Sequence, residues 1–314
     1  MSLRHKLGAL AYDWPRFLRH GLAGDPNLMR NRNEAIVTDG RGVRCEWRFT
    51  SDLHIAKVYP FTANVLLRRT LSRWPIDNRD APRMPGPPKV SFLIGHRGME
   101  RLPNLLATLR SIAGQIDVPI ECIVIEQSAQ REIEAALPTW VRYLHTPVAR
   151  DFDYCRAATF NEAVRMARGD VIIAHDNDML VPARYAAEVV DRVSEGAHFV
   201  DLKRFIFYQD ELGERITNVV QNLKGGSIAA TKEAYLAIGG FDESFVGWGG
   251  EDLEFWERAR AHGRVYEFGY LPIVHIWHRA QPGKIIGNAA PAMQRYEELR
   301  AIAPEERIRR LRER

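Results

Sequence analysis

From residue 90 onward, short apolar runs alternate with amphipathic segments, and this alternation restricts the fold more than any other feature. The runs have the length of buried strands, whereas the segments between them carry apolar residues at helical spacing. The expected order is a strand at 90–96, a helix at 101–116, strands at 121–127 and 141–146, a helix at 154–169, a strand at 170–178 and a helix at 182–196. This order predicts an α/β fold in which helices cover both faces of a largely parallel sheet.

The rest of the chain is less regular and suggests additions on both sides of this domain. Prolines and a glycine are concentrated between residues 79 and 90, which predicts an extended linker and a domain boundary near Pro88. The predicted parts are an N-terminal extension at 1–88, a main domain at 89–290 and a basic helical tail at 291–314. Further expected elements are two short strands within 35–49, a helix at 61–74, a strand at 198–209, a helix at 251–263 and a last strand starting at 271.

Composition excludes several classes of protein. With 46% hydrophobic and 27% charged residues the chain is of ordinary globular type. No apolar run approaches the roughly 18 residues that span a bilayer, and the first residues lack the apolar core of a secretion signal, so we expect a cytoplasmic location. The three cysteines lie far apart and predict neither a disulfide framework nor a zinc site.

Charge is distributed unevenly along the chain. Residues 1–88 hold 15 Lys and Arg against 8 Asp and Glu, a net charge of +7, whereas 89–314 hold 29 against 32, a net charge of −3. The basic N-terminal region and the arginine-rich end at 307–314 predict contact with an anionic partner, such as the inner face of a membrane or a phosphorylated acceptor. Solvated surface charge explains the same excess. Nucleic acid is not an expected partner, because the arginines of the 61–74 helix lack interleaved exposed aromatic residues.

Two acids lie at the end of the strand expected at 170–178. Asp176 and Asp178 are two residues apart, so an extended backbone directs both carboxylates to one side. Two anions about 5 Å apart at an effective dielectric near 20 repel by roughly 3 kcal/mol, and they need a cation or a proton. Oxygen ligands favour Mg²⁺ or Mn²⁺, although acids at strand ends also cap helices and form turns. His275 and His278 lie near the end of the last strand, and a neutral imidazole suits Mn²⁺ already held by carboxylates.

The stretch "FVGWGGEDLEF" at 245–255 concentrates glycine in front of two acids. Each glycine costs about 0.5–1 kcal/mol relative to alanine in regular structure, which indicates backbone that bends, moves or approaches a ligand closely. The three glycines are Gly247, Gly249 and Gly250. Trp248 among them offers an apolar face for a sugar ring. Glu251 and Asp252 follow at the start of a predicted helix, where the helix dipole favours negative charge whether or not the acids are catalytic.

Six blocks of sequence between Val90 and Gln281 resemble the β-1,4-galactosyltransferase family and related bacterial inverting transferases of the GT-A fold. In order, they are "GHRGMERL", "VIEQS", "FNEAVRMA" before "DNDMLVP", "GGSIAATKEAYLAIGGF", "GWGGEDLEFW" and "HIWH". The resemblance implies the fold of nucleotide-diphospho-sugar transferases, a Rossmann-like mixed sheet with helices on both faces. The small α+β N-terminal extension matches none of these blocks.

The resemblance also implies roles for individual residues. Asp178 matches the second acid of the metal motif and His278 a metal ligand, with Asp176 and His275 as further metal candidates. Asp252 matches the general base, and Glu251 beside it is the second catalytic candidate. Trp248 matches a mobile tryptophan that folds over donor and acceptor. The residues expected at the nucleotide sugar are Arg97, Glu126, Asp176, Gly226 and Trp248.

The function that the resemblance implies is metal-dependent, inverting transfer of a hexose or N-acetylhexosamine from a UDP-sugar. Mn²⁺ or Mg²⁺ is the expected cofactor, and the acceptor is a hydroxyl of a glycan, glycolipid or peptide, as in polysaccharide biosynthesis. Two alternatives stay open. A sugar-phosphate nucleotidyltransferase is one, because "LIGHRGMERLP" loosely imitates the triphosphate loop of those enzymes, with His96 in place of its second glycine. A non-catalytic scaffold that binds sugar nucleotides is the other.

Overall fold

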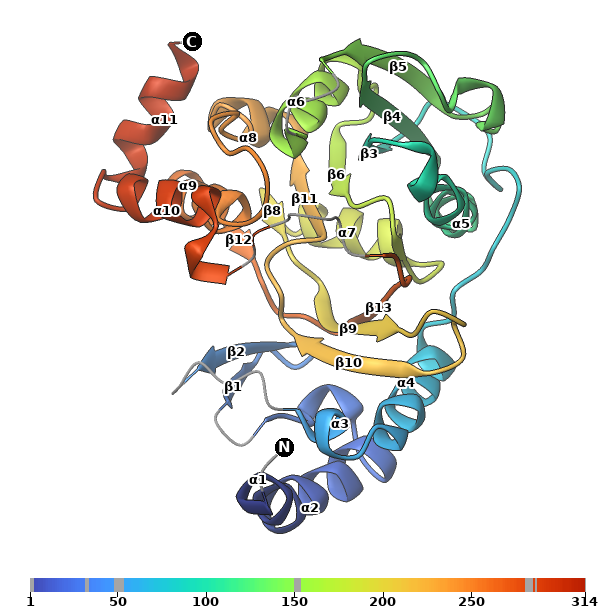
Figure 1. The fold of residues 1–314 in the computed structure, drawn as a ribbon, viewed down its shortest axis with the longest axis vertical. Helices are drawn as coiled ribbons and strands as arrows, with labels where there is room; N and C mark the ends of the chain where they lie inside the picture. The colour runs from blue at the N-terminus through green and yellow to red at the C-terminus, as the bar shows by residue number, and fades with distance from the viewer. Residues whose placement is uncertain are drawn as a thin grey trace.

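A seven-stranded mixed sheet lies at the centre of the protein (Figure 1), whose computed structural model describes residues 3–31, 34–47, 54–149, 154–279, 285 and 287–313. Its strands lie in the order β12 (Val265–Tyr266), β8 (Phe199–Val200), β11 (Ser227–Thr231), β6 (Val171–His175), β3 (Val90–His96), β4 (Ile120–Ser128) and β5 (Arg142–Pro147). Strands β6, β3, β4 and β5 run parallel, whereas β11 runs antiparallel to β6 and β8. The predicted mixed sheet is therefore confirmed.

Helices cover both faces of this sheet, as the alternating pattern predicted. One face carries α5 (Leu102–Ala113) and α7 (Tyr185–Ser194), and the other carries α6 (Arg156–Met166), α8 (Lys232–Ala237) and α9 (Glu251–His262). Successive residues of a strand point to opposite faces. Phe92 of β3 accordingly belongs to one hydrophobic core and Leu93 to the other. Both cores are apolar, and burial at about 25 cal/mol per Å² of apolar surface is what holds the layers together.

A second sheet of four strands lies beside the first. Its order is β10 (Ile216–Gln221), β9 (Lys203–Gln209), β13 (Leu271–His275) and β7 (Met179–Leu180). The single strand predicted at 198–209 is wrong, because this segment forms β8 in the large sheet and β9 in the small one. Buried Asp201 accepts hydrogen bonds from the backbone N–H of Lys203 at 3.3 Å and from its Nζ at 2.7 Å. These local bonds replace strand pairing at the bend.

The N-terminal region packs against the second sheet. It contains α1 (Leu3–Gly8), the π-helical η1 (Ala9–Asp13), α2 (Trp14–Arg16), the π-helical η2 (Phe17–Leu22), η3 (Pro26–Leu28), the hairpin of β1 (Glu34–Thr38) and β2 (Val43–Trp47), α3 (Ile55–Val58) and α4 (Phe61–Arg73). The expected hairpin and helix are present. Phe17 and Leu66 of this region share a core with Phe205 and Phe207 of β9. The domain boundary near Pro88 stays a prediction.

The C-terminal helices α10 (Pro291–Leu299) and α11 (Pro304–Arg312) pack beside α9. Arg307 of α11 and Arg258 of α9 both donate to buried Glu254, at 3.2 and 2.6 Å. Single turns complete the described chain at η4 (Met99–Arg101), η5 (Glu134–Ala136) and η6 (Gly287–Ala289). Within the ranges described, no helix is long and apolar enough to cross a membrane.

Candidate metal and catalytic site

Asp178, His275 and His278 form a cluster at the junction of the two sheets. Their potential ligand atoms all lie within 4.8 Å of one another. Nε2 of His278 is 3.4 Å from Oδ2 of Asp178, and Nε2 of His275 is 3.7 Å from its Oδ1. That Oδ1 atom is buried and has no hydrogen-bond partner among the residues that the structure describes. A buried carboxylate oxygen without a partner, next to two imidazoles, fits a divalent cation such as Mn²⁺.

Strand pairing brings these three residues together. Asp178 follows β6 directly before β7, and β7 pairs with β13 so that His275 lies opposite Met179. On its other side the His275 ring stacks on Tyr208 of β9, with ring centroids 4.5 Å apart. Burial, together with the nearby Arg101, lowers the pKa of His278. A neutral imidazole keeps the lone pair that a metal needs.

Arg156, the first residue of α6, connects the acids of two predicted sites. Its Nε donates to Asp176 at 2.7 Å, and its Nη1 donates to Asp252 at 2.8 Å and to Glu251 at 3.4 Å. Burial opposes its charge, but the fields of Asp176, Asp252 and Glu251 raise its pKa well above the ordinary value. Arg156 therefore stays cationic and holds three carboxylates together. Asp176 accordingly shares Arg156 with Asp252 and lies outside the cluster of Asp178, His275 and His278, so its role as a metal ligand stays a prediction.

Gly225 and Gly226 allow the acids to approach the backbone between β10 and β11. A Cβ on Gly225 would lie 2.2 Å from Oδ2 of Asp252, and a Cβ on Gly226 would lie 2.5 Å from Cε of Met179. The carbonyl oxygen of Gly226 also accepts a hydrogen bond from the N–H of Asp176 at 2.9 Å. These positions need glycine because a side chain would occupy the space of the acids and of Met179.

The two acids at the start of α9 differ in exposure. The Glu251 side chain is 13% exposed and the Asp252 side chain 21% exposed. Burial and the adjacent Asp252 raise the pKa of Glu251 to about 7, although Arg156 acts in the opposite direction. Asp252 is thus the more accessible of the two, and it is paired at the closer distance with Arg156.

The glycine-rich loop in front of these acids is anchored at one end. Gly247, Gly249 and Gly250 all have positive φ, near 89°, 98° and 87°. A Cβ on Gly250 would lie 2.9 Å from the carbonyl oxygen of Ala292 in α10, whereas a Cβ on Gly247 would meet no atom of the described part of the chain within 4 Å. Trp248 between them is 42% exposed. The loop is therefore packed against α10 at Gly250 and open at Gly247.

The residues expected at the nucleotide lie at the ends of the first two parallel strands. Arg97 follows β3, and Glu126 lies near the end of β4. Glu126 is fully buried and accepts hydrogen bonds from the Ser128 hydroxyl at 3.0 Å, from the Glu132 N–H at 3.2 Å and from the Tyr143 hydroxyl. Its carboxylate thus organises the loop after β4.

Sequence reasoning missed three residues of this site, Arg156, Arg101 and Gly225. Arg101 donates to Oδ2 of Asp178 at 2.8 Å. Arg156 had one available signal, because a cation at the first position of a helix opposes the helix dipole and needs nearby anions. Gly225 is the first of a glycine pair, which indicates that another group approaches the backbone closely. The pattern does not identify that group.

Comparisons with known proteins match part of this chain to a family of transferases. Residues 214–275 match the family described as the N-terminal domain of galactosyltransferase. Over 61 residues, 19% of this chain, the sequence is 39% identical to the probable N-acetylgalactosaminyltransferase 9 of Caenorhabditis elegans, and the match covers 10% of that protein. The crystal structure of GalNAc-T7 with UDP, GalNAc and Mn²⁺ superposes with a TM-score of 0.52 at 16% identity, over 70% of this chain and 50% of that one. The mannosyltransferase PcManGT of Pyrobaculum calidifontis, in complex with GDP-Man and Mn²⁺, gives a TM-score of 0.45 at 18% identity, over 82% of this chain and 83% of that one.

The fold is that of the GT-A glycosyltransferases. The segment at residues 214–275 is similar to galactosyltransferases, and a stretch of 61 residues is similar to an N-acetylgalactosaminyltransferase, in keeping with the resemblance of the sequence blocks. The matched segment contains the glycine pair, Trp248, Asp252 and His275, and it lies after Asp178 and before His278. The chain spans half the length of the GalNAc-T7 chain, and its match covers a tenth of the curated relative.

Proposed function

We propose that the protein transfers a hexose or N-acetylhexosamine from a UDP-sugar to a hydroxyl of a glycan, glycolipid or peptide. The observation that carries this proposal is the convergence of two sets of acids from distant parts of the chain. Asp178 lies in the histidine cluster, and Asp176, two residues earlier, shares Arg156 with Asp252. The similarity to N-acetylgalactosaminyltransferases, one of them solved with UDP and Mn²⁺, supports the donor class.

Asp178, His275 and His278 would hold Mn²⁺ or Mg²⁺, and Asp176 is the further acid near them. The bound ion would supply Lewis-acid neutralisation of the charge that develops on the diphosphate leaving group. Asp176 is joined to Arg156 at 2.7 Å, which supports a role for this acid beside the sugar rather than at the ion.

Asp252 is the proposed general base. It takes the proton of the acceptor hydroxyl as that oxygen forms a bond to the anomeric carbon, while the bond from this carbon to the diphosphate oxygen breaks. Attack from the face opposite the leaving group inverts the configuration. Arg156 positions the Asp252 carboxylate, and Glu251, with its raised pKa, is the second acid of this pair.

Trp248 and the strand-end residues complete the proposed donor site. The open backbone at Gly247 would let Trp248 fold over the sugar and exclude water that would otherwise hydrolyse the donor. Arg97 and Gly226 would lie at the nucleotide and the sugar, and Glu126 would shape the loop next to them. The nucleotidyltransferase alternative loses support, because Arg101 in the imitated triphosphate loop is paired with Asp178. A cytoplasmic location and a polysaccharide product stay predictions.

The Asp252→Asn variant tests this proposal. A positioned base typically contributes about 10²- to 10⁴-fold, so kcat should fall by about that range while the affinity for the UDP-sugar is nearly kept. Purified protein with Mn²⁺ is assayed against UDP-Gal, UDP-GalNAc, UDP-Glc and UDP-GlcNAc, with UDP release and product anomeric configuration as readouts.

The matched control is Glu298→Gln, which changes an exposed acid on α10 in the same way. It should keep the parent rate. Transfer by Asp252→Asn at the parent rate would remove this residue from the mechanism. Retention of anomeric configuration in the product would contradict direct displacement, and absence of UDP release from every donor would contradict the enzyme proposal.

A further inference from the structure

The N-terminal helical segment carries an exposed apolar stripe. Leucines at positions 3, 7, 10, 18 and 22 recur at helical spacing along α1, η1, α2 and η2. Their exposed fractions are 71%, 56%, 55%, 50% and 37%, in that order. Phe61 at the start of α4 adds a 55% exposed ring, 5.8 Å from the ring of Trp14. We call these five leucines and Phe61 the apolar stripe.

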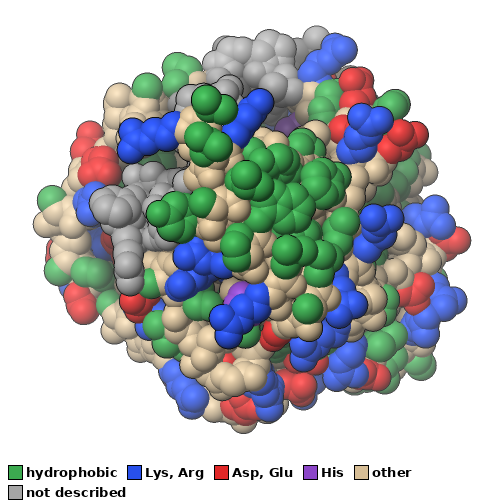
Figure 2. Space-filling view, turned by 90° about the horizontal axis from the view of Figure 1, so that it is seen from below, with side chains coloured by type: hydrophobic (Ala, Val, Ile, Leu, Met, Phe, Trp, Pro, Cys, Tyr) green, Lys and Arg blue, Asp and Glu red, His purple; other side chains and the backbone are tan. Residues whose placement is uncertain are grey.

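Basic side chains border this stripe. Figure 2, seen from the side of α1 and α2, shows hydrophobic side chains gathered on this face, with Lys and Arg around them. Residues 3–22 contain four Lys and Arg against a single acid, Asp13, which is only 3% exposed. Arg4, Lys6 and Arg19 are exposed. A face that combines a long apolar stripe with positive charge complements an anionic bilayer surface.

The helical segment is fixed to the body of the protein by its opposite side. Ala9 and Phe17 are buried, and Phe17 belongs to the core shared with β9 and α4. Its ring also packs edge-on against Trp14 at 5.6 Å. The stripe is therefore presented in the plane of the surface, and it could enter a bilayer interface without loss of the protein core.

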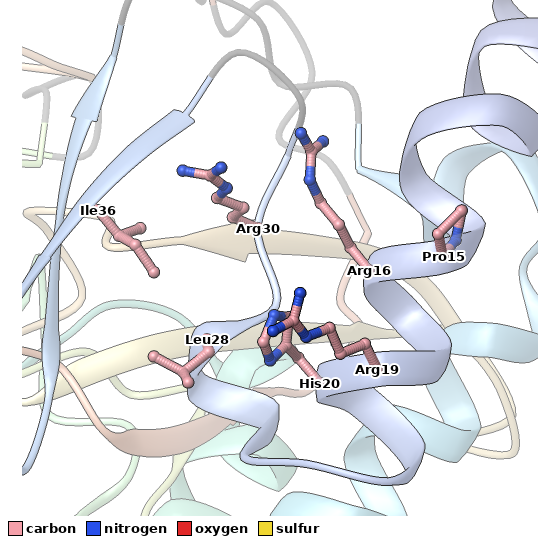
Figure 3. A pocket seen from close by; sticks show the side chains of 7 residues that line it. All are labelled: Pro15, Arg16, Arg19, His20, Leu28, Arg30 and Ile36. Carbon is pink, nitrogen blue, oxygen red and sulfur yellow. The ribbon is translucent and has the colours of Figure 1, made fainter.

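A basic hollow of about 370 Å³ opens beside η2 (Figure 3). Its cations are Arg16, Arg19 and Arg30, the His20 imidazole lies beside them, and the apolar walls include Leu28 and Ile36. Burial, then Arg19 and Arg30, lower the pKa of His20, in keeping with a positive potential inside the hollow. A phosphate group attached to an apolar chain matches cations beside aliphatic walls.

We propose that the apolar stripe and the basic hollow form one docking surface for a membrane that contains anionic phospholipids. The leucines and Phe61 enter the interface between headgroups and acyl chains, and the hollow receives a lipid phosphate. The membrane is a partner that the proposed transfer reaction does not include, and membrane binding does not require that reaction.

The test is co-sedimentation of the full chain with vesicles. Phosphatidylcholine vesicles are compared with vesicles that also contain phosphatidylglycerol, at low and high salt. The parent should bind the anionic vesicles and release as salt screens the charge. A Leu7→Asp, Leu18→Asp double variant should bind at least about tenfold more weakly, because two exposed leucines no longer enter the interface. Arg30→Gln should weaken binding about fivefold, because it removes one positive charge that is attracted to the anionic membrane surface.

Leu236→Asp is the matched control, since Leu236 is 52% exposed on α8, at the opposite end of the molecule in Figure 1. It should bind as the parent does, and unchanged circular dichroism should accompany each variant. Equal binding of the parent and the double variant, or no binding to anionic vesicles, would overturn the proposal. The proposal would also be overturned if the parent did not bind vesicles but formed a dimer that the double variant lacks. The stripe would then be the contact surface for a second copy of the chain. Co-sedimentation needs no catalysis and can be repeated with the Asp252→Asn protein. Failure of the catalytic proposal would therefore leave the result on membrane binding unaffected.

Discussion

At the scale of single residues, Arg156 has the largest electrostatic role in the site. One guanidinium pairs with three carboxylates, and its side chain is 14% exposed. Removal of one partner from a mostly buried ion pair leaves the remaining charges uncompensated. Arg156→Leu should therefore lower the free energy of unfolding by about 2–4 kcal/mol, measured by urea denaturation without added metal.

The same helix offers the control for this change. Arg165 is 69% exposed and pairs with Glu162 one turn away. Arg165→Leu should change the free energy of unfolding by less than about 1 kcal/mol, as is usual for surface pairs. Equal losses from the two variants would mean that Arg156 contributes no more than a surface charge.

Glu251 gives the site a dependence on pH. Its pKa is raised from 4.5 to about 7, so its contribution to stability is fully present below pH 4.5 and is lost as pH rises towards 7. Glu251→Gln imitates the protonated form at every pH. The variant should match the parent near pH 4.5 and be more stable above pH 7, by up to about 3 kcal/mol.

Chemical unfolding at several pH values, with chelator present, measures this difference. The expected curve for the variant minus the parent rises between the two pKa values and is flat above the upper one. A difference that does not vary with pH would contradict the raised pKa of Glu251.

Sequence reasoning found the acids and histidines of the site but not the cation between them. Asp178, His275 and Asp252 lie in short, distinctive patterns at strand ends or before a helix. Arg156 lies in an ordinary amphipathic helix, where an arginine usually faces solvent. Its burial depends on three carboxylates that come from segments 20 to 96 residues away, and no local pattern contains that information.

At the scale of elements, the two ends of the glycine-rich loop differ in packing. Gly247 and Gly250 have nearly equal positive φ, but only Gly250 contacts α10. Gly247→Ala should cost about 1–2 kcal/mol through backbone strain alone. Gly250→Ala adds a clash with Ala292 and Tyr296, so its loss should be larger by about 1–3 kcal/mol.

Thermal unfolding of the two variants checks this comparison. Backbone strain at positive φ is common to both variants, so a difference in melting temperature reports the contact with α10. Similar melting temperatures would show that α10 yields to a methyl group and does not hold the loop. Donor turnover at saturating substrate would then report whether movement at Gly247 matters for the reaction.

Element prediction succeeded where the pattern was local. The strands at 90–96 and 121–127 and the helix at 251–263 correspond to β3, β4 and α9 within a few residues. It failed for 198–209, where apolar residues typical of strands lie on both sides of Asp201 and hide the bend. Both halves of that segment are buried strands, and only their membership of different sheets separates them. Sheet membership is a tertiary property that hydrophobic periodicity does not carry.

At the scale of the whole molecule, a single buried arginine connects the N-terminal region to the second sheet. Arg204 of β9 is fully buried, pairs with Glu34 of β1 at 3.0 Å and donates to the carbonyl oxygens of Asn27 and Met29. Arg204→Met should lower the free energy of unfolding by about 3–5 kcal/mol, because Glu34 is left buried without its partner.

The core that the N-terminal region shares with the second sheet predicts that the protein unfolds in one transition. Trp14 reports on the N-terminal region and Trp256 on α9, so fluorescence and far-ultraviolet circular dichroism should give coincident transitions. Two separate transitions in the parent would mean that residues 1–88 fold as an independent unit. The exposed Arg68 on α4 supplies the control, since Arg68→Met should leave the midpoint nearly unchanged.

The position of the histidine cluster has a mechanical consequence. Asp178 lies on the link from the large sheet into the small one, and His275 ends a strand of the small sheet. An ion coordinated by both would cross-link the two layers as well as serve the chemistry. At a hundredfold excess over its Kd, such an ion adds about 2.7 kcal/mol to the folded state. Metal supply would then govern the lifetime of this protein in the cell together with its rate of turnover.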